Sequence, residues 1–342
     1  MRICVEKRNF AANIHKALPS RILLALLLYI MKILFPLILF ALVSFALPAG
    51  AQSTVIPRVQ VIEEATGTWC GWCVHGLVAM NQLEEKYPDS FIGLAVHGDD
   101  AYATDSYAPF LQRISGYPYA LINRSYSCGT KPSEMLTAYE AFAALGDAEG
   151  EAKIVDAHYA DDKYTAVEVT VNTRFAKAHT KEDYRLAFVV VEDSIRDRQT
   201  NFYASGANGE MGGFEKLGEN PYVYLRHIVR LIDSYDGIPG SVPTQISAGK
   251  TYTYTHTIAM PKVKMRRRVS IVVLLLRDQG VSIVNASRCP TIETYVPEGI
   301  AAPELDEGSS ASPLYDLQGR RLPEGATPHG LHIRGGRVIL NP

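Results

Sequence analysis

Apolar positions between residues 58 and 146 alternate between strand-like runs and helix-like spacing. Residues 59–64 are interpreted as a strand, residues 91–96 are an apolar run of strand length, and residues 119–123 and 126–128 can pair as a hairpin. Three helices are indicated by apolar residues spaced three and four apart, namely Leu77, Met80, Leu83 and Tyr87, then Tyr107, Phe110, Leu111 and Ile114, and last Met135, Leu136, Tyr139, Phe142 and Leu145. The predicted order β-α-β-α-β-β-α is typical of an α/β domain.

After Gly150 the spacing changes to a period of two residues. Val167, Val169 and Val171 alternate with polar residues, and Tyr252, Tyr254, His256 and Ile258 alternate with threonines. Further strand-length runs cover residues 153–159, 184–191, 222–232, 269–276 and 281–285. About seven strands without an intervening helix predict an antiparallel β-sandwich.

Residues 22–47 form an apolar stretch that Lys32 interrupts directly after Met31. From Met31 onward the chain has one basic residue, an apolar core and the small residues of an A-x-A cleavage site. We therefore predict that residues 1–51 comprise an over-called start before Met31 and a signal peptide cleaved after Ala51. An uncleaved signal anchor is the alternative, because the apolar stretch is long enough to span a bilayer.

Export changes the interpretation of charge and of cysteine content. The net charge of −2 includes six Lys/Arg and one Glu in the first 51 residues, so the exported part carries −7. Such an acidic chain is a poor candidate for nucleic-acid binding through phosphate neutralisation. A hydrophobic content of 47% and a charged content of 20% exclude a disordered chain. In an oxidising compartment paired cysteines tend to form disulfides, and the exported part holds Cys70, Cys73, Cys128 and Cys289.

The strongest signal for chemistry is Cys70-Gly71-Trp72-Cys73, placed between a predicted strand and a predicted helix. The unpaired N–H groups and partial positive charge of a first helical turn stabilise a thiolate at Cys70. Such a thiolate can attack a disulfide, and Cys73 lies near enough to resolve the mixed disulfide. A static structural disulfide is one alternative. A metal site, which would add for example His75 and His97 to the two cysteines, is another.

Residues 58–146 resemble a thioredoxin-fold domain in the Trp69-Cys70-Gly71-Trp72-Cys73 motif, in the element order and in Pro118 before a strand. The resemblance implies that Cys70 is the nucleophile, Cys73 the resolving thiol and Pro118 a cis-proline opposite the dithiol. It also places Glu64 where a buried acid assists proton transfer, with Glu63 as the alternative if the strand register shifts by one residue. The expected substrate-binding residues are Trp69, Trp72, Tyr117 and His97.

A second resemblance covers most of the exported chain. Its motifs are Thr66-Gly67-Thr68-Trp69-Cys70, Ala95-Val96-His97-Gly98-Asp99, Gly116-Tyr117-Pro118 with Asn123-Arg124, and Val191-Glu192-Asp193. Together they are similar to the 28-kDa outer-membrane-protein-related family of Gram-negative bacteria with type IX secretion. The resemblance implies a thioredoxin-like domain joined to a β-sandwich, and a location in the periplasm or at the outer membrane or cell surface. Residues 315–321 and 330–333 resemble the C-terminal sorting segments of that family.

The expected fold class is therefore an α/β thioredoxin-like domain (residues 52–150) followed by an all-β antiparallel sandwich (151–296). Residues 297–313, rich in Pro, Glu, Ala, Ser and Gly, are interpreted as a linker. Residues 314–342 are interpreted as a C-terminal hairpin with a sorting-like tail. The basic residues within 262–268 are interpreted as a charged edge strand that prevents aggregation.

Two functions follow from these expectations. The first is an exported thiol–disulfide oxidoreductase that exchanges disulfides with envelope proteins through Cys70 and Cys73, without cofactor, metal or nucleic acid. The second is a non-enzymatic binding protein, associated with the outer membrane or the surface, in which the Cys70–Cys73 disulfide is structural. The partners of Cys128 and Cys289 stay open, because four cysteines allow three pairings.

Overall fold

The computed structural model describes residues 55–206 and 211–289 together with several short stretches, namely residues 29, 32, 292, 314–315, 321–322, 330–334 and 337–341. The predicted signal peptide, apart from Lys32, and the predicted linker lie outside the described residues. The chain divides into two compact units, Met1–Ser53 and Thr54–Pro342, and the second contains every feature discussed below. Within the described residues, no helix combines the length and the apolar character that crossing a membrane requires.

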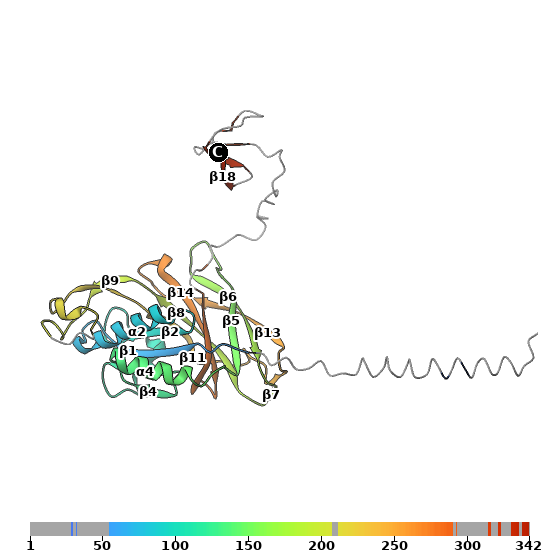
Figure 1. The fold of residues 1–342 in the computed structure, drawn as a ribbon, viewed down its shortest axis with the longest axis horizontal. Coiled ribbons are helices and arrows are strands. Elements are labelled where there is room, and N and C mark those ends of the chain that lie inside the picture. Colours follow the sequence, from blue (N-terminus) through green and yellow to red (C-terminus); the bar gives the residue numbers. More distant parts are fainter. Residues whose placement is uncertain are drawn as a thin grey trace, which may run out of the picture. The chain divides into compact units, whose positions relative to one another are not determined.

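Eight strands from both halves of the chain form one mixed sheet in the order β15-β14-β8-β11-β2-β1-β3-β4 (Figure 1). They are β1 (Gln60–Thr66), β2 (Phe91–His97), β3 (Tyr119–Ile122), β4 (Tyr126–Cys128), β8 (Tyr184–Glu192), β11 (Ile228–Ile238), β14 (Val269–Arg277) and β15 (Ser282–Cys289). The junction between the halves is parallel, with Ile228 of β11 opposite Ala95 of β2. The amide of Ile283 on the edge strand β15 also donates to the carbonyl of Asn123, which follows β3, at 3.0 Å.

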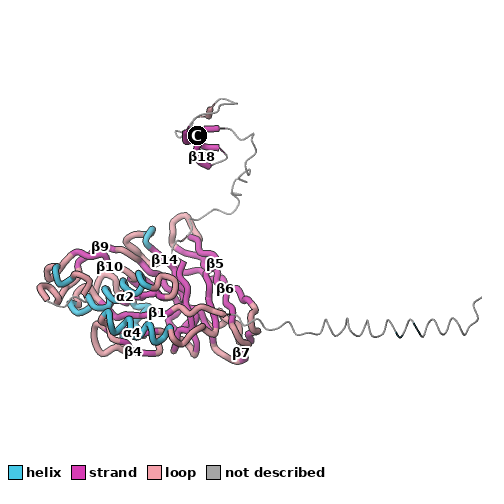
Figure 2. The backbone as a smooth tube through the Cα atoms, viewed as in Figure 1, coloured by secondary structure: helices cyan, strands magenta, loops and turns pink. Residues whose placement is uncertain are grey.

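The predicted fold class is wrong. Strands dominate the structure (Figure 2), and those expected to form a thioredoxin-like domain share one large sheet with those expected to form a separate sandwich. Most individual strands were predicted correctly, but a local pattern of apolar residues does not name the partner of a strand. The register between β11 and β2 aligns a single residue pair, Ile228 with Ala95, and beside it the Ala95 amide donates to the His227 carbonyl at 2.7 Å. The residue boundaries assigned to the two parts stay a prediction.

Two helices lie where the sequence predicts them. They are α2 (Val74–Lys86) and α4 (Pro132–Ala143), which begins with a proline in its first turn and is followed by Gly146 at φ +75°. The helix expected around Tyr107 is reduced to a 3₁₀ turn, η2 (Asp105–Tyr107), and the single turn α3 (Ala108–Leu111).

A second antiparallel sheet, in the order β13-β6-β5, packs on the large one. It contains β5 (Gly150–Tyr159), β6 (Ala166–Phe175) and β13 (Thr251–Ala259). The predicted alternation along β6 is confirmed, because Val167, Val169 and Val171 are buried against Leu186, Phe188 and Val190 of β8. This core therefore joins a three-stranded sheet to one half of the eight-stranded sheet.

The remaining strands are short. Two pairs are β7 (His179–Thr180) with β12 (Gln245–Ile246), and β9 (Ile195–Arg198) with β10 (Tyr222–Leu225). The strand expected over residues 222–232 is broken at His227, whose φ of 59° ends β10 before β11 begins. The predicted C-terminal hairpin is confirmed by the pairing of β17 (Gly330–Arg334) with β18 (Arg337–Asn341), and β16 (Leu314–Tyr315) pairs with β17.

The interpretation of residues 262–268 as an edge strand is wrong. Within the described residues, this segment is a loop between β13 and β14 that ends in the 3₁₀ turn η4 (Arg266–Arg268). Its five basic side chains are exposed. They therefore need an explanation other than protection of a sheet edge.

The two faces of the eight-stranded sheet carry different partners. One face holds an apolar cluster to which both halves contribute, including Val61 of β1, Leu94 of β2, Val189 of β8 and Leu274 of β14. On the opposite face, α2 and α4 pack on β1, β2 and β3 around Ile62. The shared apolar cluster makes the stability of each half depend on the other.

A buried ion pair lies on the face of the shared cluster. Glu63 of β1 and Arg124, after β3, are 0% and 3% exposed, and Oε1 of Glu63 lies 3.0 Å from Nη2 of Arg124. Tyr107 donates its hydroxyl proton to Glu63 at 2.9 Å. Arg124 also donates to the carbonyl of Tyr235 on β11 at 2.7 Å. The pair thus connects β1 to β11, and its remaining hydrogen-bonding groups are used.

Removing the cation of this pair tests its role. We expect Arg124→Met to lower the free energy of unfolding by about 3–5 kcal/mol, because the Glu63 carboxylate is then buried without a cation beside it. The matched control is Arg174→Met, which breaks a partly exposed pair with Glu151 at 2.7 Å and should cost about 0–1 kcal/mol. Urea unfolding measures both, and equal losses would contradict the structural role of the buried pair.

Candidate functional site

The candidate site is the turn between β1 and α2. The chain leaves β1 at Thr66, passes through the 3₁₀ turn η1 (Gly71–Cys73) and enters α2 at Val74. Cys70 and Cys73 form a disulfide, and their exposed fractions are 5% and 1%. The neighbouring Trp69 and Trp72 are 46% and 51% exposed. The turn therefore buries its sulfur atoms and presents its indole rings.

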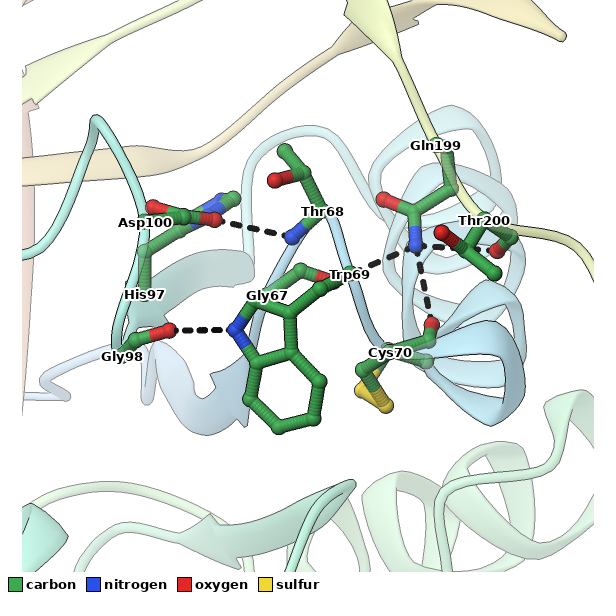
Figure 3. Close-up of a disulfide and its surroundings, with 10 residues drawn as sticks. Gly67, Thr68, Trp69, Cys70, His97, Gly98, Asp100, Gln199 and Thr200 are labelled. Carbon is green, nitrogen blue, oxygen red and sulfur yellow. Dashed lines mark hydrogen bonds and ion pairs between the residues drawn. A yellow bond between two sulfur atoms is a disulfide. The ribbon is translucent and has the colours of Figure 1, made fainter. Parts of the chain in front are cut away.

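A carboxylate from the loop after β2 holds one side of the turn (Figure 3). Asp100 accepts from the Thr68 amide at 2.8 Å and lies 2.7 Å from Nδ1 of His97. Trp69 donates its indole N–H to the Gly98 carbonyl at 2.8 Å. Burial by itself would raise the pKa of Asp100, but the hydrogen bond and charge of His97 and two backbone N–H donors lower it to about 2.

A distant segment, residues 199–202, holds the other side, and we call it the clamp segment. Gln199 donates from Nε2 to the carbonyls of Gly67 at 3.2 Å and Cys70 at 2.9 Å (Figure 3). The Thr200 amide donates to the Thr68 carbonyl at 2.8 Å, and the Phe202 amide donates to the Gly71 carbonyl at 3.2 Å.

The ring of Phe202 covers the middle of the disulfide turn. A Cβ atom added to Gly71 would lie 2.4 Å from that ring, so only glycine allows this approach. Phe202 itself is exposed on its outer side. The clamp segment therefore adds to the aromatic surface while covering the backbone beside the disulfide.

Aromatic side chains flank the disulfide on both sides, and we call Trp69, Trp72, Tyr117 and Phe202 the aromatic surface. The rings of Trp69 and Tyr117 pack edge to face at 5.3 Å between centroids. Those of Trp72 and Phe202 do the same at 5.5 Å. Trp69 and Trp72 belong to the turn that the clamp segment and Asp100 hold in place, and Phe202 belongs to the clamp segment itself.

Among the residues expected from the sequence, Tyr117 and Pro118 lie close to Trp69, and their peptide bond is cis. His97 is buried and faces Asp100, so its ring is turned away from the surface. His75 contacts the hydroxyl of Tyr203. Among the described residues, no group of three or more His, Cys, Asp or Glu side chains is arranged to hold a metal ion.

Glu64 lies beneath the site. Its carboxyl group is directed at Gly76, where an added Cβ would lie 2.0 Å from Oε1. Oε1 has no hydrogen-bond partner among the described residues, and burial raises the pKa of Glu64 well above its usual value. Glu63 faces the opposite side of the sheet and pairs with Arg124. The register of β1 thus places Glu64, and not Glu63, under the first turns of α2.

Cys128 lies on the same rung of the sheet as Glu64, with Ala120 between them. It carries a free, buried thiol, and burial raises the pKa of that thiol to about 11. Cys128 is therefore protonated and shielded under ordinary conditions.

Sequence reasoning missed Gln199, Phe202 and Asp100. Asp100 lies three residues after His97, so the pair could have been recognised as an interacting His–Asp motif. Gln199 is 129 residues from Cys70, and no local signal connects them.

Together with the predicted export, these features define an envelope protein whose exposed aromatic turn is closed by a disulfide. The chain belongs to the family of the outer membrane protein Omp28, whose family model matches residues 108–292. The family expected from the sequence is thereby confirmed, and so is export to the periplasm, outer membrane or cell surface.

Solved structures are similar at low sequence identity. HBP35 of Porphyromonas gingivalis matches with a TM-score of 0.53 and 16% identity, covering 84% of this chain and 96% of that one. A protein of Agrobacterium tumefaciens matches at 0.40 and 18%, over 71% and 98% of the two chains. A domain of the outer membrane lipoprotein Omp28 from Porphyromonas gingivalis matches at 0.23 and 16%, over 44% and 92%. No curated protein matches the chain.

The Asp100 network predicts a pH dependence. Because the pKa of Asp100 falls from its ordinary value of 3.8 to about 2 on folding, its ionised form stabilises the protein above pH 4. That contribution is lost as the pH falls toward 2. We expect Asp100→Asn to be less stable than the wild type at pH 6, with a difference that shrinks between pH 4 and 2.

Urea midpoints at several pH values measure this difference. Asp99→Asn, at the exposed neighbouring carboxyl, is the control and should show no such convergence. A stability gap for Asp100→Asn that stays constant from pH 6 to 2 would rule out the proposed linkage.

The cover over Gly71 predicts a kinetic effect. Phe202→Ala should speed reduction of the Cys70–Cys73 disulfide by dithiothreitol several-fold, because access to the sulfurs controls their reactivity. Tyr222→Ala removes another exposed aromatic ring and should leave the rate unchanged. Tryptophan emission reports the reduction, and identical rates for both variants and the wild type would refute the covering role.

Proposed function

We propose that this chain is an envelope-associated binding protein that contacts a partner protein through the aromatic surface, and that its Cys70–Cys73 disulfide is structural. The observation that carries the proposal is the contrast at the turn between buried sulfurs and exposed indoles. Reactive cysteines are usually partly exposed, whereas buried structural ones are inert. Membership of an outer-membrane-protein family supports the location of such a partner in the envelope.

The composition of the aromatic surface supports a protein partner. Trp and Tyr are enriched among residues that dominate binding energy, since they bury a large rigid area and keep a polar group for hydrogen bonding. The disulfide, Gln199 and Asp100 fix the backbone that carries Trp69 and Trp72. Such preorganisation lowers the entropy that binding must otherwise overcome.

Thiol–disulfide exchange at the same turn is the second candidate, and Glu64 favours it. A buried carboxyl group without a hydrogen-bond partner lowers the stability of the fold. Groups with such a shifted pKa cluster at functional sites. A partner thiolate would attack the sulfur of Cys70, form a mixed disulfide and release the sulfur of Cys73 as a thiolate. Protonated Glu64, under the next turn of α2 at Gly76, would then supply the proton. A second partner thiolate attacking the mixed disulfide would release Cys70 and leave the partner oxidised.

A redox titration with trapping distinguishes the two functions. For the binding protein, tryptophan emission should give a disulfide midpoint below about −300 mV, where structural disulfides lie. Cys73→Ser should accumulate no mixed disulfide with envelope proteins. A midpoint between about −120 and −270 mV, the range of exchange catalysts, together with trapped partners would instead establish exchange.

The aromatic surface is tested by crosslinking in intact cells. A crosslinking group at position 202 should join the protein to its partner by a bond other than a disulfide. We expect Trp69→Ala combined with Trp72→Ala to abolish this crosslink. Tyr126→Ala, at an exposed ring on β4, is the matched control and should leave it intact. An equal yield of the crosslink with the wild-type indoles and in the Trp69→Ala, Trp72→Ala variant would contradict the proposal.

A further inference from the structure

A second surface carries a concentration of positive charge that neither candidate function uses. The loop between β13 and β14 exposes Lys262, Arg266, Arg267 and Arg268, and the strand β9 exposes Arg196 and Arg198. We call these six residues the basic surface. Within the described part of the chain, none of them forms an ion pair with an acidic side chain, whereas Arg124, Arg174, Arg185, Arg277 and Arg288 all do.

Two contacts place the loop beside β9. The Asp193 amide, just before β9, donates to the Arg268 carbonyl at 2.9 Å. Lys264 of the loop lies 3.1 Å from the carboxylate of Asp197, between Arg196 and Arg198. The basic residues of the two segments therefore belong to one region of the surface.

The acidic groups of this region are already engaged. Asp197 accepts from Tyr102 at 2.5 Å as well as pairing with Lys264. Glu192 is buried and accepts from the Met265 amide at 2.5 Å. Asp193 accepts from the His227 amide at 2.7 Å. Asp197 and Glu192 thus pair with Lys264 and Arg230, and no described carboxylate forms an ion pair with the basic surface, although the exported chain as a whole is acidic.

Exposed aromatic side chains accompany the arginines. Tyr222 and Tyr224 lie on β10, directly opposite Arg198 and Arg196 of β9, and both rings are exposed. The guanidinium carbons of Arg196 and Arg198 lie 4.7 and 4.5 Å from the centre of the Tyr222 ring. Tyrosine is favoured at the boundary between headgroups and hydrocarbon, and long basic side chains place their charge among headgroup phosphates.

We propose that the basic surface, with Tyr222 and Tyr224, docks the protein onto anionic lipid headgroups of an envelope membrane. The charge complementarity selects an anionic surface, and the exposed tyrosines select a membrane over a soluble polyanion. The binding is peripheral and weakens with salt, because exposed charges are screened within about 10 Å at 0.1 M ionic strength. The aromatic surface at Cys70 is then available to a protein partner on the same membrane.

Vesicle co-sedimentation tests the proposal with the full chain. We expect binding to vesicles of phosphatidylcholine mixed with phosphatidylglycerol, and none to phosphatidylcholine alone. Combined Lys262→Gln, Arg267→Gln and Arg268→Gln should weaken binding roughly 100-fold, at about fivefold for each charge near an anionic surface. These three exposed side chains form no hydrogen bond or ion pair with the described residues, so the variant should stay folded, which circular dichroism and the urea midpoint check.

The matched control removes three exposed charges elsewhere, as Lys153→Gln, Lys177→Gln and Lys250→Gln. It should keep most of the binding to anionic vesicles. Equal losses in the two triple variants would show only a general charge effect and would overturn the proposal, as would binding to neutral vesicles or absence of binding at low salt.

Polyglutamate separates a membrane from an acidic polypeptide. Tyr222→Ala with Tyr224→Ala should reduce vesicle binding several-fold. Polyglutamate should bind weakly and compete poorly with the vesicles. Tighter binding of polyglutamate than of anionic vesicles would identify an acidic protein as the partner and overturn the assignment to lipid.

Discussion

One apolar core shared by both halves of the chain is the constraint on which the rest depends. Side chains from β1 and β2 pack in the same cluster as those from β8, β11 and β14, and the two groups of strands meet where Ile228 lies opposite Ala95. Apolar burial of this extent is the main favourable contribution to folding. Because the core is continuous, the segment between β8 and β11 is fixed relative to β1, and with it the clamp segment.

The disulfide turn is consequently a product of tertiary structure. Asp100 and Trp69 attach it to the loop after β2, while Gln199 and Phe202 attach it to a segment far along the chain. Gln199 thereby adds a second donor to the carbonyls of Gly67 and Cys70, which also accept from the amides of Cys70 and Cys73 within the turn. These contacts also leave both indole rings facing outward. The same arrangement that hides the sulfur atoms therefore creates a rigid aromatic surface, and the basic surface on β9 lies on the same segment that carries the clamp.

The sequence predicted most of the strands and two of the three expected helices, but not the residues that hold the disulfide turn in place. Period-two valines predicted β6, helical spacing predicted α2, and a C-terminal hairpin was predicted within residues 314–342. The sequence did not predict which strands pair with one another, and the predicted fold class was therefore wrong. The parallel pairing of β11 with β2 at Ala95 covers one residue, and a local pattern of apolar residues does not indicate it. His97 was expected at the surface, but Asp100 turns it inward. Gln199 could not be found because its hydrogen-bond acceptors are defined only once the shared core has formed.

Hydrogen exchange measured by mass spectrometry tests most directly whether the clamp segment holds the turn. In the wild type, amides of residues 68–73 and 199–202 should be protected together. Gln199→Ala should expose both groups while leaving β5 and β6 protected, because those strands pack in a different core. Unchanged protection of residues 68–73 in that variant would contradict the account, since the turn would then keep its structure without the Gln199 side chain.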